Sequence, residues 1–145
     1  MKKNQQRASS TYNRSSRPGA IETLPIIPES GKVPPQAIEL EEAVLGALIT
    51  ESKAIDLITL EPEDFYNQKH QVIFAAIQNI KDQRQPIDLL TVMQELQKTN
   101  TLEEAGGVAY LADVSDKIAS ASHIEHHAAI IKQKAIARKI IAQSY

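Results

Sequence analysis

Apolar side chains recur every three or four positions from residue 36 onward, which is the period of a helix with one buried face. The first such helix is expected from Gln36, with glutamates near its start, where the helix dipole favours carboxylates. Its apolar positions are Ile38, Val44, Leu45, Leu48 and Ile49. The pattern predicts a helix that packs one side against a core.

Three further helices are predicted in the middle of the chain. A short one covers residues 54–60 and stops before Pro62, because proline disrupts a helix that has already begun. A longer one carries an apolar stripe and ends near Asp82. After Pro86 breaks the pattern, Asp88 is placed to cap the third, since its carboxylate can accept hydrogen bonds from the free amides of a first turn.

Two glycines interrupt the helical pattern after residue 100. Residues 101–105 are expected to form a single turn, which Gly106 and Gly107 close because positive φ costs glycine little. A short helix over residues 108–119 follows.

The last predicted helix runs from His123 to at least Ser144, without glycine or proline. Ser122 and Glu125 have the spacing of a capping box at its start. One face carries Ile124, Ala128, Ile131, Ala135, Arg138 and Ile141. Joined to the preceding helix by a short turn, it should form an αα-hairpin whose apolar stripe so small a domain can hardly bury, and we expect a partner to cover it.

The predicted fold class is therefore all-α, a small globular helical subdomain followed by an αα-hairpin whose last helix leads into a linker. Residues 1–32 are rich in polar residues, proline and glycine and contain few apolar side chains, so we expect a disordered basic tail. The globular subdomain is assigned to residues 33–102. Residues 103–145 are assigned to the hairpin and the start of a linker helix.

Composition narrows the class of protein. The chain has no cysteine, which excludes disulfides and thiolate metal sites, and no tryptophan, so the core must be aliphatic. Its longest apolar runs are far shorter than a bilayer span, and no apolar stretch follows Lys2 and Lys3 as a secretory signal would require. We therefore expect a cytoplasmic protein without a membrane partner.

The net charge of −2 is unevenly distributed. Residues 1–20 contain five basic residues and no acid, so the rest of the chain carries a net charge of −7. An acidic folded domain is poorly suited to binding the phosphate backbone of DNA by itself.

The sequence contains little that suggests catalysis. None of its five glycines begins the G-x-x-x-x-G-K-[ST] motif of a phosphate-binding loop. His123, His126 and His127 have a spacing that could hold a metal ion, but no further ligand completes a set, and solvated helix-face histidines are the favoured interpretation. We expect no catalytic residue, no cofactor-binding residue and no metal site.

Adjacent carboxylates point to different faces of a helix, so they do not form the facing pair that acid–base catalysis needs. Solvated surface charge is the favoured interpretation of these pairs. They are Glu41 with Glu42, Glu63 with Asp64, and Glu103 with Glu104.

Five blocks of residues, in order, resemble DnaB-type replicative DNA helicases, and together they cover residues 33–145. The first is Val33-Pro34-Pro35-Gln36-Ala37-Ile38-Glu39-Leu40-Glu41-Glu42-Ala43-Val44-Leu45-Gly46. The others are Asp64-Phe65-Tyr66 with His70, Ile73 and Phe74; Pro86-Ile87-Asp88 with Thr91; Leu102-Glu103-Glu104-Ala105-Gly106-Gly107 with Tyr110-Leu111; and Ala121-Ser122-His123-Ile124. Ala37 departs from the family, which often has a capping polar residue there, and this leaves the first helical turn less secure.

The resemblance implies the N-terminal assembly domain of such a helicase. In that family subunits pair through this region into a trimer of dimers, a collar on a hexameric ring where primase docks. A helicase loader is a further expected partner, and DNA, ATP and magnesium are expected at a motor domain that would follow. The implied oligomer-interface residues are Ile118, Ile124, Ile131 and Ala135. This chain itself should neither hydrolyse ATP nor unwind DNA.

Two other functions stay open at this point. One is a free-standing helical regulator or loader-interaction module without a motor, which gene context would distinguish. The other is a nucleic-acid-binding protein that works through the basic tail, which would show a salt-dependent DNA affinity that is lost when residues 1–20 are deleted.

Overall fold

A computed structural model describes residues 33–117 and 121–144. The helices belong to one compact unit that begins at Pro35. All regular structure in the described residues is helical, which confirms the predicted all-α class. The predicted tail, residues 1–32, and the predicted interface residue Ile118 lie outside the described residues.

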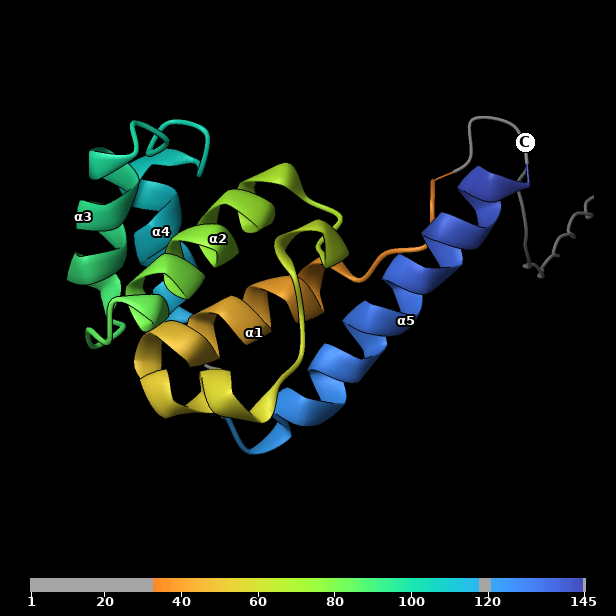
Figure 1. The fold of residues 1–145 in the computed structure, drawn as a ribbon, viewed down its shortest axis with the longest axis horizontal. Coiled ribbons are helices and arrows are strands. Elements are labelled where there is room, and N and C mark those ends of the chain that lie inside the picture. The colour runs from red at the N-terminus through yellow and green to blue at the C-terminus, as the bar shows by residue number, and fades with distance from the viewer. Residues whose placement is uncertain (1–32, 118–120, 145) are drawn as a thin grey trace, which may run out of the picture. The chain divides into compact units, whose positions relative to one another are not determined.

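Helix α1 (Ile38–Thr50) is the element against which most of the others pack. It contacts α2 (Gln68–Asp82), α4 (Gly107–Asp116) and α5 (Ile124–Gln143), and Figure 1 shows it at the centre of these helices. Its side chains from Val44 to Ile49 are buried. Ala37 occupies the N-cap position without a side-chain hydrogen bond, so the first turn does lack the capping group that a polar residue would provide.

Two helix starts follow from their capping residues. The side chain of Asn67 accepts a hydrogen bond from the amide of Lys69 at the start of α2. Asp88 caps α3 (Leu89–Lys98), as predicted, by accepting from the amide of Thr91, whose hydroxyl in turn accepts from the amide of Asp88. These reciprocal bonds satisfy amides that the first turn leaves without partners.

The segment between α1 and α2 differs from the prediction of a helix over residues 54–60. It contains the 3-10 helix η3 (Ser52–Leu57), an extended stretch, and a second 3-10 helix, η4 (Pro62–Asp64). Ile58 is extended, with φ of −123° and ψ of 158°, a conformation that β-branched residues favour. Pro62 was predicted to stop a helix, but it begins the helical turn η4. At this first position a helix needs no hydrogen bond from the amide that proline lacks.

The two helices that were predicted to form a hairpin are α4 and α5, and each of them packs against α1. Gly106 lies at the N-cap of α4 and Gly107 is its first residue, with φ of 103° and 84°, as the predicted glycine turn requires. Before α5, residues Ala121–His123 form the 3-10 turn η5, so α5 begins at Ile124 with His123 at its N-cap, one position later than predicted. The predicted boundary between residues 102 and 103 stays a prediction.

The apolar stripe of α5 is buried within the chain from Ile124 to Ala135, contrary to the expectation that the domain could not cover it, whereas Ile141 at its end is exposed. Ile124 and Ile131 are each 1% exposed and Ala135 is 3% exposed. Helix α1 packs along this part of α5 and supplies the covering surface. The hypothesis that these three side chains meet another subunit assumed an open stripe, and that assumption is wrong.

Helices α1 and α4 approach unusually closely at Gly46. A β-carbon at this position would lie 2.7 Å from the carbonyl oxygen of Val114, a distance shorter than real β-carbon contacts show. Only glycine therefore allows the two backbones to lie this close together.

Candidate interaction surface

A buried carboxylate joins α1 to the start of α2. Glu41 is 1% exposed, and its oxygens accept hydrogen bonds from the backbone amides of Tyr66 and Asn67, at 2.7 and 3.3 Å. Nδ1 of His70, a fully buried side chain, lies 2.8 Å from the same carboxylate. A carboxylate can only accept, so Nδ1 donates the proton of this bond. Three donors thus replace the water that Glu41 would lose on burial.

The other side of the His70 ring connects this carboxylate to α4. Nε2 lies 2.6 Å from the hydroxyl of Tyr110, which donates to Glu42 at 3.1 Å. Lys117 completes the chain with its Nζ 3.0 Å from the second oxygen of Glu42. We call Glu41, His70, Tyr110, Glu42 and Lys117 the polar network. It joins α1, α2 and α4 and runs from the core to the surface.

The network shifts the pKa values of its outer members. Burial alone would raise the pKa of Glu42, but hydrogen bonds from Lys117 and Tyr110 bring it below its ordinary value of 4.5. Burial and the neighbouring Glu42 carboxylate raise the pKa of the Tyr110 hydroxyl above its usual range. The ionised form of Glu42 and the neutral form of Tyr110 are therefore the states that the fold favours.

The lowered pKa of Glu42 predicts an acid-sensitive contribution to stability. Because the folded pKa lies below the unfolded one, the contribution is complete above about pH 4.5 and is lost as the pH falls through the folded value. Urea midpoints should therefore separate wild type from Glu42→Gln at pH 7, and the gap should narrow as the pH falls below about 4.5. A gap that stays the same at every pH would contradict the role given to Glu42.

The structure corrects the interpretation of two carboxylate pairs as solvated surface charge. Glu41 and Asp64 are only 1% and 2% exposed. The sequence contains a signal for Glu41, which shares the apolar face of α1 because it lies three positions after Ile38 and four before Leu45. His70 likewise precedes Ile73 and Phe74 by three and four positions, so the spacing also predicts that His70 lies on the buried face of its helix.

Asp64 anchors α5 to the segment that precedes α2. Its carboxylate accepts from Nζ of Lys132 at 2.8 Å and from the amide of Glu61 at 2.8 Å. One guanidinium, that of Arg138, donates to the backbone oxygens of Asp64 and Pro35, at 2.7 and 2.8 Å. The C-terminal half of α5 is thus tied to the body by polar contacts.

Beyond these contacts α5 exposes large apolar side chains. No residue of α5 after Ala135 is buried, and Ile136, Ile140 and Ile141 are 50%, 61% and 43% exposed. We call these three residues the isoleucine face. Figure 1 shows this end of α5 extending beyond the other helices. Three isoleucines this exposed on one helix segment are typical of a surface that a partner covers.

The histidines at the start of α5 lie near one another. The ring centroid of His127 is 6.2 Å from those of both His123 and His126, and partial burial together with these two neighbours lowers its pKa. Across residues 33–117 and 121–144, no group of three or more side chains is arranged to hold a metal ion. The absence of a metal site stays a prediction.

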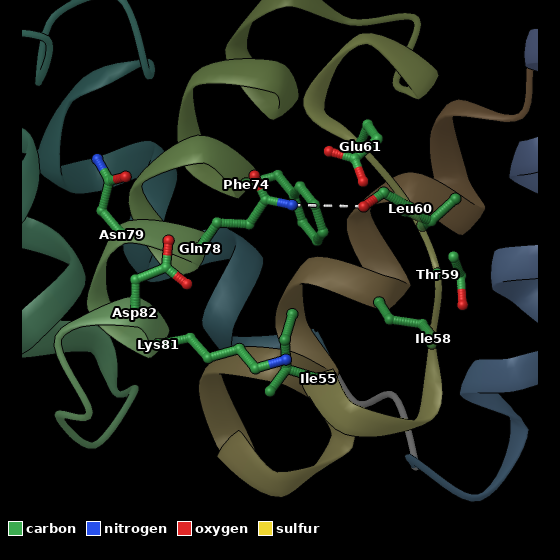
Figure 2. Close-up of a pocket in the computed structure, with 10 residues that line it drawn as sticks. All are labelled: Ile55, Ile58, Thr59, Leu60, Glu61, Phe74, Gln78, Asn79, Lys81 and Asp82. Carbon is green, nitrogen blue, oxygen red and sulfur yellow. Dashed lines mark hydrogen bonds between the residues drawn. The ribbon is translucent and has the colours of Figure 1, made fainter.

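A groove of about 400 Å³ lies between α2 and the extended stretch after η3 (Figure 2). The amide of Gln78 crosses from α2 to the carbonyl of Leu60, with its nitrogen 3.4 Å from that oxygen. Glu61 and Asp82 line different walls, so they do not form the facing carboxylates of a catalytic pair.

Among the described helices, none has both the length and the apolar character needed to cross a membrane.

The sequence matches a family and several proteins of known role. Residues 33–133 match the family model described as the DnaB-like helicase N terminal domain. The chain is 48% identical over 114 residues to the replicative DNA helicase DnaB of Rhodothermus marinus, covering 77% of this chain and 12% of that protein. It is 43% identical over 112 residues to the replicative DNA helicase DnaC of Bacillus subtilis, covering 76% and 25%. The chain therefore spans a quarter or less of these relatives.

Two solved structures share the fold. The N-terminal domain of DnaB helicase from Mycobacterium tuberculosis superposes with a TM-score of 0.74 at 31% identity, over 77% of this chain and 79% of that one. A DnaB-like replicative helicase, described together with its interactions with primase, superposes with a TM-score of 0.67 at 27% identity, over 74% and 25%.

Proposed function

The chain belongs to the family of DnaB-like helicase N-terminal domains, and from this premise we propose that it is the assembly and primase-docking domain of a hexameric replicative DNA helicase. The observation that carries the proposal is the match of residues 33–133 to that family. The extensive superposition on a solved N-terminal domain supports it. Unwinding of duplex DNA with ATP and magnesium would then belong to the motor domain of the whole helicase.

The proposed partners are further copies of the chain, primase and a helicase loader. Primase is supported by the similar helicase described with its primase interactions. The net charge of −7 outside residues 1–20 suits a collar that does not trap DNA, which the motor would bind. The whole helicase would act in the cytoplasm as a hexamer built from a trimer of dimers.

Self-association needs an exposed apolar surface, and we place it on the isoleucine face. The earlier hypothesis named Ile124, Ile131 and Ala135, but a side chain only 1–3% exposed cannot reach a second subunit while α5 stays packed on α1. Ile136 and Ile140 lie one helical turn apart on α5, and Ile141 widens the same surface. Each is at least 43% exposed.

The test is the solution mass of the full chain by multi-angle light scattering over a concentration series, alone and with the C-terminal domain of primase. We expect a dimer or larger species that also retains primase. Ile140→Glu should shift this species toward the monomer without loss of helix, because it places a charge in the apolar contact.

Ala142→Glu is the matched control, since it adds the same charge to the same end of α5 but on the side opposite Ile140. It should leave the mass unchanged. A wild-type chain that stays monomeric and indifferent to primase at all concentrations would overturn the proposed function and favour a helical module without a motor.

A further inference from the structure

Among the described residues, Arg138 is the last on α5 whose side chain hydrogen-bonds to the body of the domain. The buried side chains of α5 end at Ala135, one turn earlier. Within residues 33–117 and 121–144, the one side-chain hydrogen bond donated after Arg138 is local, from Ser144 to the carbonyl of Ile141. The direction in which the exposed end of α5 leaves the domain therefore depends on what holds Arg138.

The guanidinium of Arg138 bridges two segments that are far apart in sequence. Nη1 donates to the carbonyl of Pro35, just before α1, and Nη2 donates to the carbonyl of Asp64 in η4. The guanidinium carbon lies 5.4 Å from the centre of the Tyr66 ring, within the range of a cation–π contact. The guanidinium thus uses two N–H donors that point in different directions and its flat face against the Tyr66 ring. Arginine has this combination and lysine lacks it.

The anchor at Asp64 is itself held in place. Its side chain is buried and accepts bonds from Lys132 on α5 and from the amide of Glu61. The amide of Tyr66 bonds to the buried carboxylate of Glu41, which fixes the neighbouring backbone to α1. The Asp64 acceptor of Arg138 thus lies on backbone that the core already positions.

We propose that Arg138 is a positioning residue for assembly: it fixes the angle at which α5 leaves the domain and so orients the isoleucine face. The functional part of this inference rests on the proposed function. The geometric part concerns this chain alone.

The expected effect follows from the length of helix left free. With Arg138 in place, residues 139–144 extend beyond the last tether, which is about 9 Å of helix. Without it, the last fixed residue becomes Ala135 and the free segment grows to about 13.5 Å. Ile136, Ile140 and Ile141 then all lie on the free segment, so every residue of the isoleucine face gains freedom of direction.

The chain has no cysteine, so two introduced cysteines can be spin-labelled without further changes. Labels at Gln97→Cys on α3 and Ala142→Cys on α5 are both at exposed positions. Pulsed electron–electron dipolar spectroscopy then measures the distribution of distances between the end of α5 and the body. We expect a narrow distance distribution in the doubly labelled protein that keeps Arg138. The distribution should be broader when Arg138→Ala or Arg138→Lys is added.

Lys139→Ala is the matched control, because it removes an exposed cation from the adjacent position and should keep the narrow distribution. Arg138→Lys retains the positive charge and is the milder change, so it serves if Arg138→Ala fails to fold. An unchanged distribution in Arg138→Ala would overturn the inference. A narrow distribution in Arg138→Lys alone would overturn the requirement for a forked donor.

The functional part is tested by the dissociation constant of the self-complex, measured by light scattering. If loss of Arg138 leaves about a tenth of the molecules with α5 correctly directed, and both copies of a dimer use this face, the constant should rise about a hundredfold, about tenfold for each copy, while helix content stays the same. An unchanged constant in a broadened variant would overturn the link to assembly. A wild-type chain without self-association would count against the proposed function, and the distance measurement alone would then decide the inference.

Discussion

The His70→Leu protein should lose about 1–3 kcal/mol of unfolding free energy, the cost of leaving a buried hydrogen-bonding group without its partner. Leucine fills a similar volume but cannot donate to Glu41, whose carboxylate would stay buried with one donor fewer. It also leaves the hydroxyl of Tyr110 without its 2.6 Å contact. The connection from α1 through α2 to α4 would be broken at its middle member.

Urea unfolding followed by circular dichroism measures this loss. His126→Leu is the control, since His126 is exposed on α5 and its replacement should change stability by less than about 0.5 kcal/mol. A loss for His70→Leu no larger than that of the control would show that the polar network contributes little to the fold.

Ile131→Glu should unfold the chain, or leave it with only a small fraction folded at neutral pH. Ile131 is 1% exposed between α5 and the core, where an unpaired carboxylate has neither water nor a cation to stabilise it. The cost is several kcal/mol, comparable with the total stability of a small domain, about 5–15 kcal/mol.

Ile140→Glu makes the same substitution nine positions along the same helix, at a side chain that is 61% exposed. Its thermal midpoint should stay close to that of wild type. Circular dichroism of the two variants over a temperature ramp distinguishes a helix that the domain buries from a helix that a partner must cover. Ile131→Glu that melts like wild type would restore the open stripe inferred from the sequence.

Local signals predicted the helices well because capping and periodicity act over a few residues. Asp88 begins α3 through its own side chain, and Gly106 ends a turn through its own φ angle. The class of fold and its family resemblance both follow from such local information. The segment over residues 54–60 was less predictable because η3 packs against α1 and α5, and its own spacing does not reveal these contacts.

Long-range pairing was where the sequence interpretation was wrong. The apolar stripe of α5 was expected to be covered by another subunit, because nothing in its spacing reveals that α1 packs against it. The solvated interpretation of Glu41 was similarly incomplete, since its donors come from Tyr66, Asn67 and His70, which are distant in sequence. The isoleucine face could be found only once the structure showed which part of α5 is already covered.

The close contact at Gly46 has a consequence for the order of folding. Glycine in the middle of α1 weakens an isolated helix by about 1 kcal/mol relative to alanine, and α1 also lacks a side-chain cap. This segment should therefore be largely unstructured until Val114 and its neighbours on α4 approach it. Helix α1 would then form as it docks on α4. Both would be partly structured in the same transition state, although their residues are far apart in the chain.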